Sequence, residues 1–149
     1  MLSSSEGVLT DNILTDGDRV IFSPSFGIAT VVVKPGTIRG SGPAKINGKK
    51  ICVDGDEKDV QVPGCSYISG PYSVPGTGTL KISKLASNQI TRESKTGGKA
   101  ILLKGGDFTA KFEVQSPAKM PPNANTPDPS PEYSGSGSFV ASNIITKGT

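Results

Sequence analysis

Two cysteines and a short acidic group are the side chains in this chain that could most directly perform chemistry. Cys52 and Cys65 could form a disulfide or act as free thiols. The acidic group consists of Asp54, Asp56, Glu57 and Asp59. Such carboxylates could work as a catalytic pair or hold a cation. A zinc site would need them as ligands beside the two thiols, because the chain contains no His.

The surrounding sequence favours simpler roles for these residues. Without His, the chain cannot build the Ser-His or Cys-His arrangements of nucleophilic enzymes. Gly97-Gly98-Lys99-Ala100 lacks the spacing and the Ser or Thr of a phosphate-binding loop. The acidic group surrounds Gly55 and is typical of a solvated turn. We therefore predict no enzyme, no cofactor and no metal site, and two partly buried thiols with a disulfide as the alternative.

Composition indicates one all-β domain spanning residues 1–149. Only 34% of the residues are hydrophobic, whereas Gly and Pro contribute 19 and 12. Gly and Pro interrupt regular structure, so we expect a small, turn-rich domain of short strands and hairpins with little or no helix. The lysines are scattered and the net charge is only +3, which does not indicate nucleic-acid binding. Met1 to Thr10 has no secretory pattern, so we expect synthesis in the cytoplasm without a signal peptide.

A tight hairpin is the clearest local prediction. Lys45-Ile46 and Lys49 to Val53 flank Asn47-Gly48, a pair that accepts the positive φ values of a type I′ turn. Arg19 to Phe22 and Gly27 to Val33 are also predicted strands. The second contains a continuous apolar run from Ile28, which predicts burial on both faces.

Glycine and proline set the other expected boundaries. Val60 to Val62 is a predicted strand that ends at Pro63-Gly64, and residues 65–72 are expected to form a loop. The other expected elements are a strand over Thr77 to Leu85, a turn or two of helix within Leu85 to Ser94, and a hairpin of Lys99 to Lys104 with the alternating Phe108 to Val114.

The C-terminal third begins with a proline-rich segment. Pro117 to Pro131 predicts an extended, solvent-facing linker that returns to a final strand pair at Phe139-Val140 and Ile144-Ile145. Three Gly-x-Gly triplets begin at Gly40, Gly76 and Gly135, each before a strand-like stretch. We interpret them as turns before strands, and the alternative is a body of approximately threefold shape suited to a trimer.

Several short motifs resemble those of PAAR-like proteins, the conical spike tips of contractile injection systems. Ile46, Asn47 and Gly48, followed by Gly55 and Asp56, are similar to the turn motifs of that family. The versions in extracellular, phage-tail-like particles resemble the chain in further stretches, which are Pro75 to Thr79, Gly97 to Ala100, Leu103 to Gly105, Ser116 to Ala118 and Tyr133 to Phe139. The type VI secretion members bind a metal through three His and a Cys, and this chain lacks those His.

The resemblance implies a structural, non-enzymatic function. A PAAR-like tip caps and sharpens a trimeric β-helical spike, VgrG-like or tail-spike-like, with one copy per trimer, and helps to pierce the target envelope. It implies transient contact with the target membrane, a toxin cargo as a further partner, no nucleic acid, and assembly into a phage-tail-like particle that is released. Cys52 or Cys65 would correspond to the apex Cys of the family, or both would form a disulfide.

A binding module is the alternative. An extracellular carbohydrate- or receptor-binding β-module, such as a phage tail or decoration protein, would also be rich in strands, Gly and Ser. It would need exposed aromatic rings for stacking on sugars, and the Tyr side chains available are Tyr67, Tyr72 and Tyr133.

Overall fold

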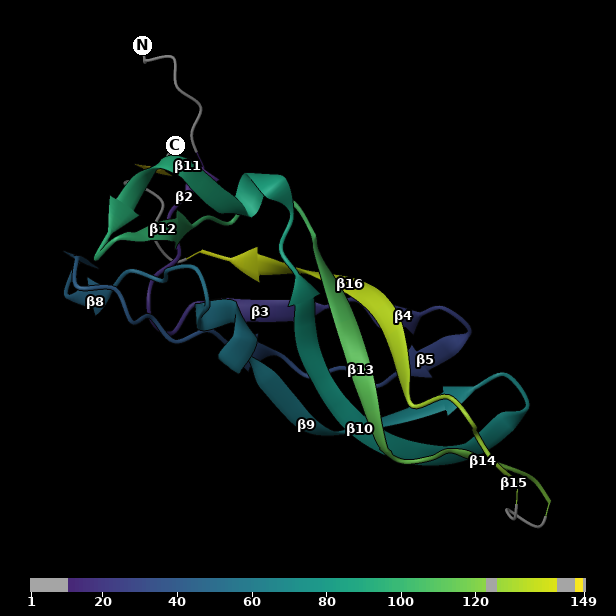
Figure 1. Cartoon of the computed structure of the whole chain (residues 1–149). Helices are drawn as coiled ribbons and strands as arrows, with labels where there is room; N and C mark the ends of the chain where they lie inside the picture. The colour runs from purple at the N-terminus through teal and green to yellow at the C-terminus, as the bar shows by residue number, and fades with distance from the viewer. Residues whose placement is uncertain (1–10, 123–125, 142–146, 149) are drawn as a thin grey trace.

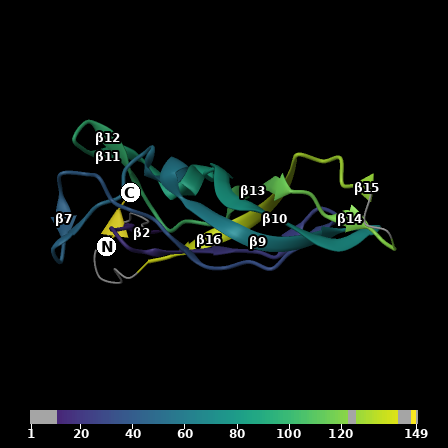
Figure 2. The ribbon, with the colours of Figure 1, turned by 90° about the horizontal axis from the view of Figure 1, so that it is seen from below.

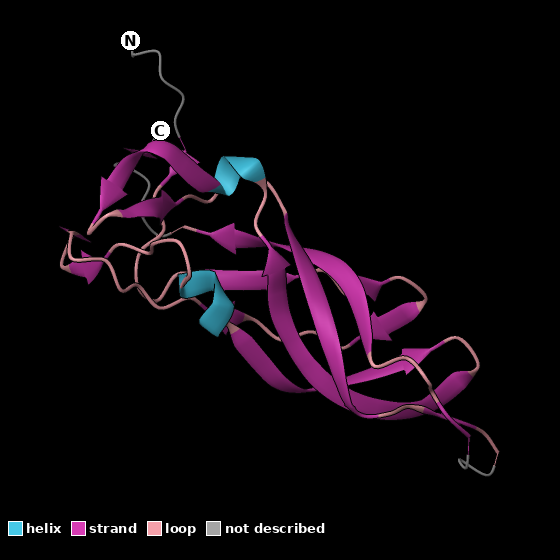
Figure 3. Cartoon of the chain, viewed as in Figure 1, coloured by secondary structure: helices cyan, strands magenta, loops and turns pink. Residues whose placement is uncertain are grey.

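The computed structural model describes residues 11–122, 126–141 and 147–148, and they form an all-β structure (Figures 1 and 3). The long strands are β9 (Gln61–Ser69), β10 (Tyr72–Lys84), β11 (Ile90–Thr96), β13 (Phe108–Ser116) and β16 (Glu132–Val140). The short ones are β2 (Asp11–Asn12), β3 (Arg19–Phe22), β4 (Ser25–Phe26), β5 (Ala29–Val31), β6 (Gly36–Thr37), β7 (Lys45–Ile46), β8 (Lys49–Lys50), β12 (Lys99–Leu102), β14 (Lys119–Met120), β15 (Thr126–Pro127) and β17 (Lys147–Gly148). Two 3-10 helices, η1 (Asp56–Asp59) and η2 (Ser87–Gln89), complete the described elements. None of the described helices has the length and apolarity to cross a membrane.

The main sheet is antiparallel and curls on itself. Its order is β4-β5-β9-β10-β13-β16-β3-β6, so β3 and β4, which follow each other in the chain, lie at opposite ends of this order. A Cβ built on Gly135 of β16 would lie 2.6 Å from Cδ2 of Phe26 in β4, and one on Gly36 of β6 would lie 2.9 Å from Cγ2 of Val62 in β9. The two edges of the sheet therefore approach each other around a single core.

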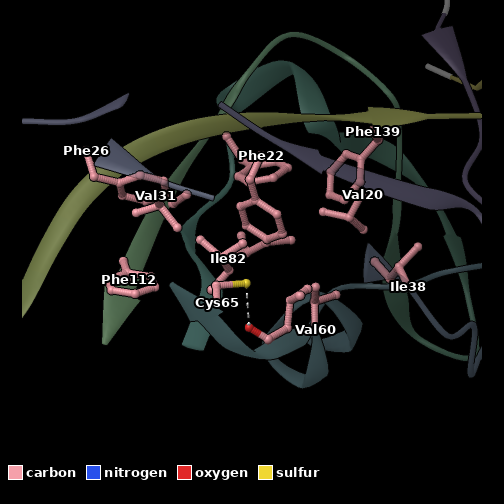
Figure 4. Close-up of a cluster of buried hydrophobic side chains, with 14 of the residues drawn as sticks. Val20, Phe22, Phe26, Val31, Ile38, Val60, Cys65, Ile82, Phe112 and Phe139 are labelled. Atoms are coloured by element: carbon pink, nitrogen blue, oxygen red, sulfur yellow. Dashed lines mark hydrogen bonds between the residues drawn. The ribbon is translucent and has the colours of Figure 1, made fainter. Parts of the chain in front are cut away.

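That core is built on aromatic rings along the inside of the curled sheet (Figure 4). All five Phe side chains are buried. The ring of Phe108 lies 5.6 Å from that of Phe22 and 5.1 Å from that of Phe139. Farther along the body, Phe112 lies 6.1 Å from Phe26 and 5.1 Å from Tyr67. Rings at these separations attract one another in addition to the area they bury.

Glycines inside the central strands make room for these rings. Gly137 lies directly opposite Phe108 in the β13–β16 ladder, and a Cβ on it would be 2.5 Å from Cζ of Phe108. A Cβ on Gly78 of β10 would be 2.5 Å from Cζ of Phe112. The interpretation of the triplets at Gly76 and Gly135 as turns before strands is therefore wrong, because these glycines lie within β10 and β16. Gly76 is packed against the backbone of residues 116–118, and Gly135 against the ring of Phe26.

Two predicted interruptions are bulges within continuous strands. β9 passes through Pro63 and Gly64, and residues 65–69, predicted as loop, continue it. Pro63 and Gly64 of β9 both lie opposite Thr79 of β10, which is a β-bulge, and Gly64 has a φ of 72°. The bulge accommodates Pro63, which has no N–H to donate to the neighbouring strand. β10 likewise begins at Tyr72, ahead of its predicted start, and Pro75 lies in a register shift. Gly70-Pro71 is the turn between the two strands.

Two pairing and burial predictions are also wrong. The run from Ile28 to Val33 is not buried on both faces, since Ile28 and Val32 are 72% and 65% exposed. Their strand has the core on one side only. Lys99 to Lys104 does not pair with Phe108 to Val114: β12 pairs with β11, whereas β13 pairs with β10 and β16.

Three predictions made from local sequence patterns are confirmed. The β7–β8 hairpin has Asn47 and Gly48 at φ values of 51° and 81°. Phe108, Ala110 and Phe112 are buried, as their alternation predicts, and the expected short helix is η2.

The proline-rich segment differs from a simple solvent-facing linker. Its strands β14 and β15 pair with each other, and β14 also pairs with β10. Ala118 and Asp128 are buried. The segment is thus fastened to the sheet. Of the predicted final strand pair, Phe139-Val140 belongs to β16, and Ile144-Ile145 lies outside the described residues.

The molecule is elongated and has two different ends (Figures 1 and 2). At the broad end lie three separate two-stranded sheets, β2–β17, β7–β8 and β11–β12. At the narrow end lie β14 and β15 with the turn between β9 and β10. The long strands β9, β10, β13 and β16 connect the two.

Replacing Gly137 by Ala tests the packing of aromatic rings on glycine. The new methyl group would overlap both the ring of Phe108 and the carbonyl oxygen of Ile21, each 2.5 Å from the added Cβ. We therefore expect Gly137→Ala to lower the free energy of unfolding by about 1–3 kcal/mol in urea denaturation. Ser136→Ala in the same strand is the control and should change it by less than about 0.5 kcal/mol. Equal effects of the two substitutions would show that the ring contact does not limit this position.

Candidate functional site

Three chain segments at the broad end form a closed ring of hydrogen bonds. The Leu14 N–H donates to the carbonyl of Leu102 at 3.0 Å, and the Leu102 N–H donates to the carbonyl of Cys52 at 3.0 Å. The Cys52 N–H donates in turn to the carbonyl of Leu14 at 2.9 Å. Each segment therefore donates to one neighbour and accepts from the other. We call residues 12–16, 50–54 and 100–104 the triangular ring.

Further contacts repeat the same threefold pattern. Isolated antiparallel bridges link Ile13 to Leu103, Thr15 to Ile51, and Val53 to Ile101. Outside them, N–H groups donate to carbonyls in three equivalent pairs, which are Asp16 to Lys50 at 2.8 Å, Asp54 to Ala100 at 2.9 Å, and Lys104 to Asn12 at 2.9 Å. The three segments thus have the same pattern of backbone hydrogen bonds and are related by approximate threefold symmetry.

The triangular ring has two apolar sides. Leu14, Cys52 and Leu102 are completely buried and belong to the main core. The residue before each of them, Ile13, Ile51 and Ile101, belongs instead to a second cluster with Leu103. This is the alternation of side chains expected of extended backbone. One side of the ring therefore closes the main core and the other packs among the small sheets of the broad end.

Each segment of the ring also continues one of the small sheets. Asn12 pairs with Lys147 in β2–β17, Lys50 pairs with Lys45 in β7–β8, and Ala100 pairs with Lys95 in β11–β12. The three hairpin-like sheets thus follow the same approximate threefold arrangement as the ring they surround.

A sequence repeat underlies this arrangement, and it differs from the Gly-x-Gly triplets. The stretches Ile-Leu-Thr-Asp-Gly-Asp from Ile13, Ile-Cys-Val-Asp-Gly-Asp from Ile51 and Ile-Leu-Leu-Lys-Gly-Gly-Asp from Ile101 occupy the three positions. In the first two, an aspartate closes the turn: Asp18 accepts from the Thr15 N–H at 2.9 Å and Asp56 from the Val53 N–H at 2.8 Å. This repeat is the signal that would have identified the ring.

The family-like turn residues all lie near the ring. Ile46, Asn47 and Gly48 form the β7–β8 turn, and Ile46 packs against the second apolar cluster. Gly55, with a φ of 105°, and Asp56 form the turn after the second ring segment. The structure thus brings both motifs to the broad end.

The acidic group is not simply a solvated turn. Asp56 is buried and also accepts hydrogen bonds from Ser41, at 3.1 Å from its N–H and 2.6 Å from its hydroxyl. Glu57 accepts from the Gly55 N–H at 2.8 Å. The carboxylates of Asp56 and Glu57 thus stabilise the turn through hydrogen bonds from backbone N–H groups. Asp54 and Asp59 are exposed. Within the described residues, no three Cys, Asp or Glu side chains converge in a way that could hold a metal ion.

Both cysteines are buried and free in the structure. Burial, and secondarily the charges of Asp56, Asp18 and Asp16, raise the pKa of Cys52. Burial also raises the pKa of Cys65, whose Sγ lies 3.6 Å from the carbonyl oxygen of Val62. Thiols in such environments stay protonated near neutral pH and are poor nucleophiles.

A polar cluster at the narrow end was missed in the sequence. Asp128, in the proline-rich segment, accepts hydrogen bonds from the hydroxyls of Tyr67 at 2.9 Å and Tyr133 at 2.6 Å. The Tyr67 oxygen accepts from the Ala118 N–H at 2.9 Å, and the Tyr133 hydroxyl lies 2.8 Å from that of Ser69. These residues, 61 positions apart between Tyr67 and Asp128, carry no common motif. The cluster fastens the proline-rich segment to β9 and β16.

The protonation of this cluster suits a structural role. Burial alone would raise the pKa of Asp128, but hydrogen bonds from Tyr133, the Ser130 N–H and Tyr67 outweigh it and lower the pKa. Burial, with hydrogen bonding to Asp128, raises the pKa of Tyr67 to about 12 and also raises that of Tyr133. None of the three groups can exchange a proton readily near neutral pH.

The same cluster removes the aromatic surface that a sugar-binding module would need. Tyr67 is buried, Tyr133 is half-buried within the cluster, and Tyr72 is half-buried beside the core. In the described part of the chain, no aromatic side chain is exposed for stacking on a sugar.

Replacing Asp128 by Asn tests the polar cluster. The lowered pKa means that Asp128 stabilises the fold fully above its ordinary value of 3.8, and that this stability is lost as the pH falls through the lower folded-state value. We expect Asp128→Asn to cost about 1–3 kcal/mol in urea unfolding at neutral pH, and the cost to shrink in acid. The control is Asp59→Asn, an exposed carboxylate. A cost that is independent of pH would contradict this account.

Comparison with known proteins identifies the family. No curated protein matches the chain. The family model described as "Contractile injection system spike tip protein" matches residues 9–149, all but the first eight. This is a family of structural proteins and not a known enzyme family, and its members associate with a spike or tail complex in a phage-tail-like particle. The chain belongs to the contractile injection system spike tip family.

Proposed function

We propose that the protein caps the blunt end of a trimeric, β-helical spike, with one copy per trimer, and that its narrow end leads into the target envelope. The triangular ring is the observation that carries this proposal. A single chain that binds on the axis of a trimer meets three equivalent surfaces, and a body with approximate threefold symmetry can contact all of them alike.

The broad end suits docking on a β-structured partner. It consists of the ring and three two-stranded sheets, whose strand edges can pair with the strand ends of another chain. Capping would in turn cover the exposed edges of the spike, which otherwise pair indiscriminately. Strand ends offer backbone groups to a partner, and by their sequence Ile28 to Val33 and Lys99 to Lys104 are two candidate docking segments. They lie at different positions along the body (Figure 1), and only the second belongs to the ring.

The narrow end suits a leading point. Residues 61–80, which form β9, its turn and the first part of β10, contain no charged side chain. A charged side chain in the centre of a bilayer costs about 3 kcal/mol, so this uncharged stretch lowers the barrier at a membrane, and Lys119 of the neighbouring β14 is the exposed charge beside it. Four long antiparallel strands connect this point to the broad end, and the Tyr–Asp cluster fastens the proline-rich segment at the point itself.

Measuring stoichiometry tests the cap. The full chain is mixed with the trimeric spike protein encoded beside it, and the complex is sized by light scattering after size exclusion. We expect one copy of this chain per spike trimer. Thr126→Arg, in β15 at the narrow end, is the control and should leave the complex unchanged, because the narrow end faces away from the spike. A protein that remains alone, or three copies per trimer, would contradict the proposal.

A further inference from the structure

A set of lysines follows the same approximate threefold arrangement as the triangular ring. Lys45 lies opposite Lys50 in β7–β8, Lys95 lies opposite Ala100 in β11–β12, and Lys147 lies opposite Asn12 in β17–β2. Lys50, Ala100 and Asn12 are the three equivalent positions whose carbonyls accept hydrogen bonds within the ring. By register, a lysine therefore occurs at the same position in each of the three small sheets.

Lys45 and Lys95 are available for an external partner. The side chains of Lys45 and Lys95 are exposed. None of the ion pairs found within the described residues includes either of them. Lys49, Lys50 and Lys99 are also exposed on the same two sheets. Like charges grouped in this way repel one another, and an acidic group placed opposite each lysine would relieve the repulsion.

We propose that Lys45, Lys95 and Lys147 bind one acidic side chain from each of the three chains of the spike. This inference rests on the proposed function and specifies the chemistry of its docking surface. A trimer presents any acidic residue near its end three times around the axis, which matches three lysines at equivalent positions. An anionic membrane lacks such threefold order, and in the proposed orientation the narrow end is the part directed toward it.

Charge reversal tests the three lysines as a set. The full chain carrying Lys45→Glu, Lys95→Glu and Lys147→Glu is compared with the unaltered chain for binding to the immobilised trimeric spike protein at low and high salt. We expect the affinity to fall about tenfold or more, mainly through slower association, because exposed charges act chiefly on encounter. The salt dependence of binding should also weaken. Each single reversal should account for a similar part of the loss.

A second triple variant controls for net charge. Lys34, Lys84 and Lys119 are exposed and lie outside the three small sheets, so reversing them changes the net charge equally. This variant should bind the spike nearly as well as the unaltered chain. Circular dichroism and thermal melting establish that both triple variants fold, and the single reversals replace any triple variant that does not.

The outcomes separate this inference from the proposed function. If the unaltered chain does not bind the spike, the proposed function fails. If it binds and the first triple variant binds equally well, or both triple variants lose the same affinity, the function stands and the lysine site is overturned. Vesicles of phosphatidylcholine and phosphatidylserine form a further arm. Loss of vesicle binding without loss of spike binding in the first variant would assign the lysines to lipid and overturn the inference.

Discussion

The closed exchange of backbone hydrogen bonds among Leu14, Cys52 and Leu102 is the constraint on which the rest of the structure depends. Extended segments of five residues are too short to be stable alone, so each segment depends on the presence of both neighbours. The first and third segments lead through a short turn into β3 and β13, and the second leads through η1 into β9. Closing the ring therefore determines where three strands of the main sheet begin, and brings together parts of the chain that are far apart in sequence.

The curled sheet solves a second problem, which is how to stabilise an elongated body with few apolar residues. Aromatic rings are the largest of the fully buried side chains, and glycines in the facing strands allow the backbone to approach them. Glycine usually destabilises a strand because it has no side chain to cover the backbone. Here an aromatic ring covers the backbone instead, which reduces this destabilisation. Gly137 beneath Phe108 is the clearest instance.

The two ends differ in both symmetry and charge, and this difference gives the molecule a direction. The broad end repeats one backbone pattern three times and carries exposed lysines. The narrow end has no such repetition, and Asp128 is held there by two tyrosines. Tyr67 joins the narrow-end cluster to the core, because its ring packs on Phe112 and its hydroxyl belongs to the polar cluster.

Local chemistry determined what the sequence alone could predict: the all-β class, the Asn47-Gly48 hairpin and the buried side of Phe108 to Phe112. Each depends on neighbouring residues, through turn dihedrals or period-two alternation. The tertiary structure decided which strands pair, the passage of β9 through Pro63-Gly64, and the exposure of Ile28. These depend on distant partners: a bulge tolerates Pro and Gly only when adjacent strands hold both sides. The Ile-Leu-Thr-Asp-Gly-Asp repeat was present in the sequence, but unequal spacing hid it, and only the closed hydrogen-bond ring showed that its copies meet.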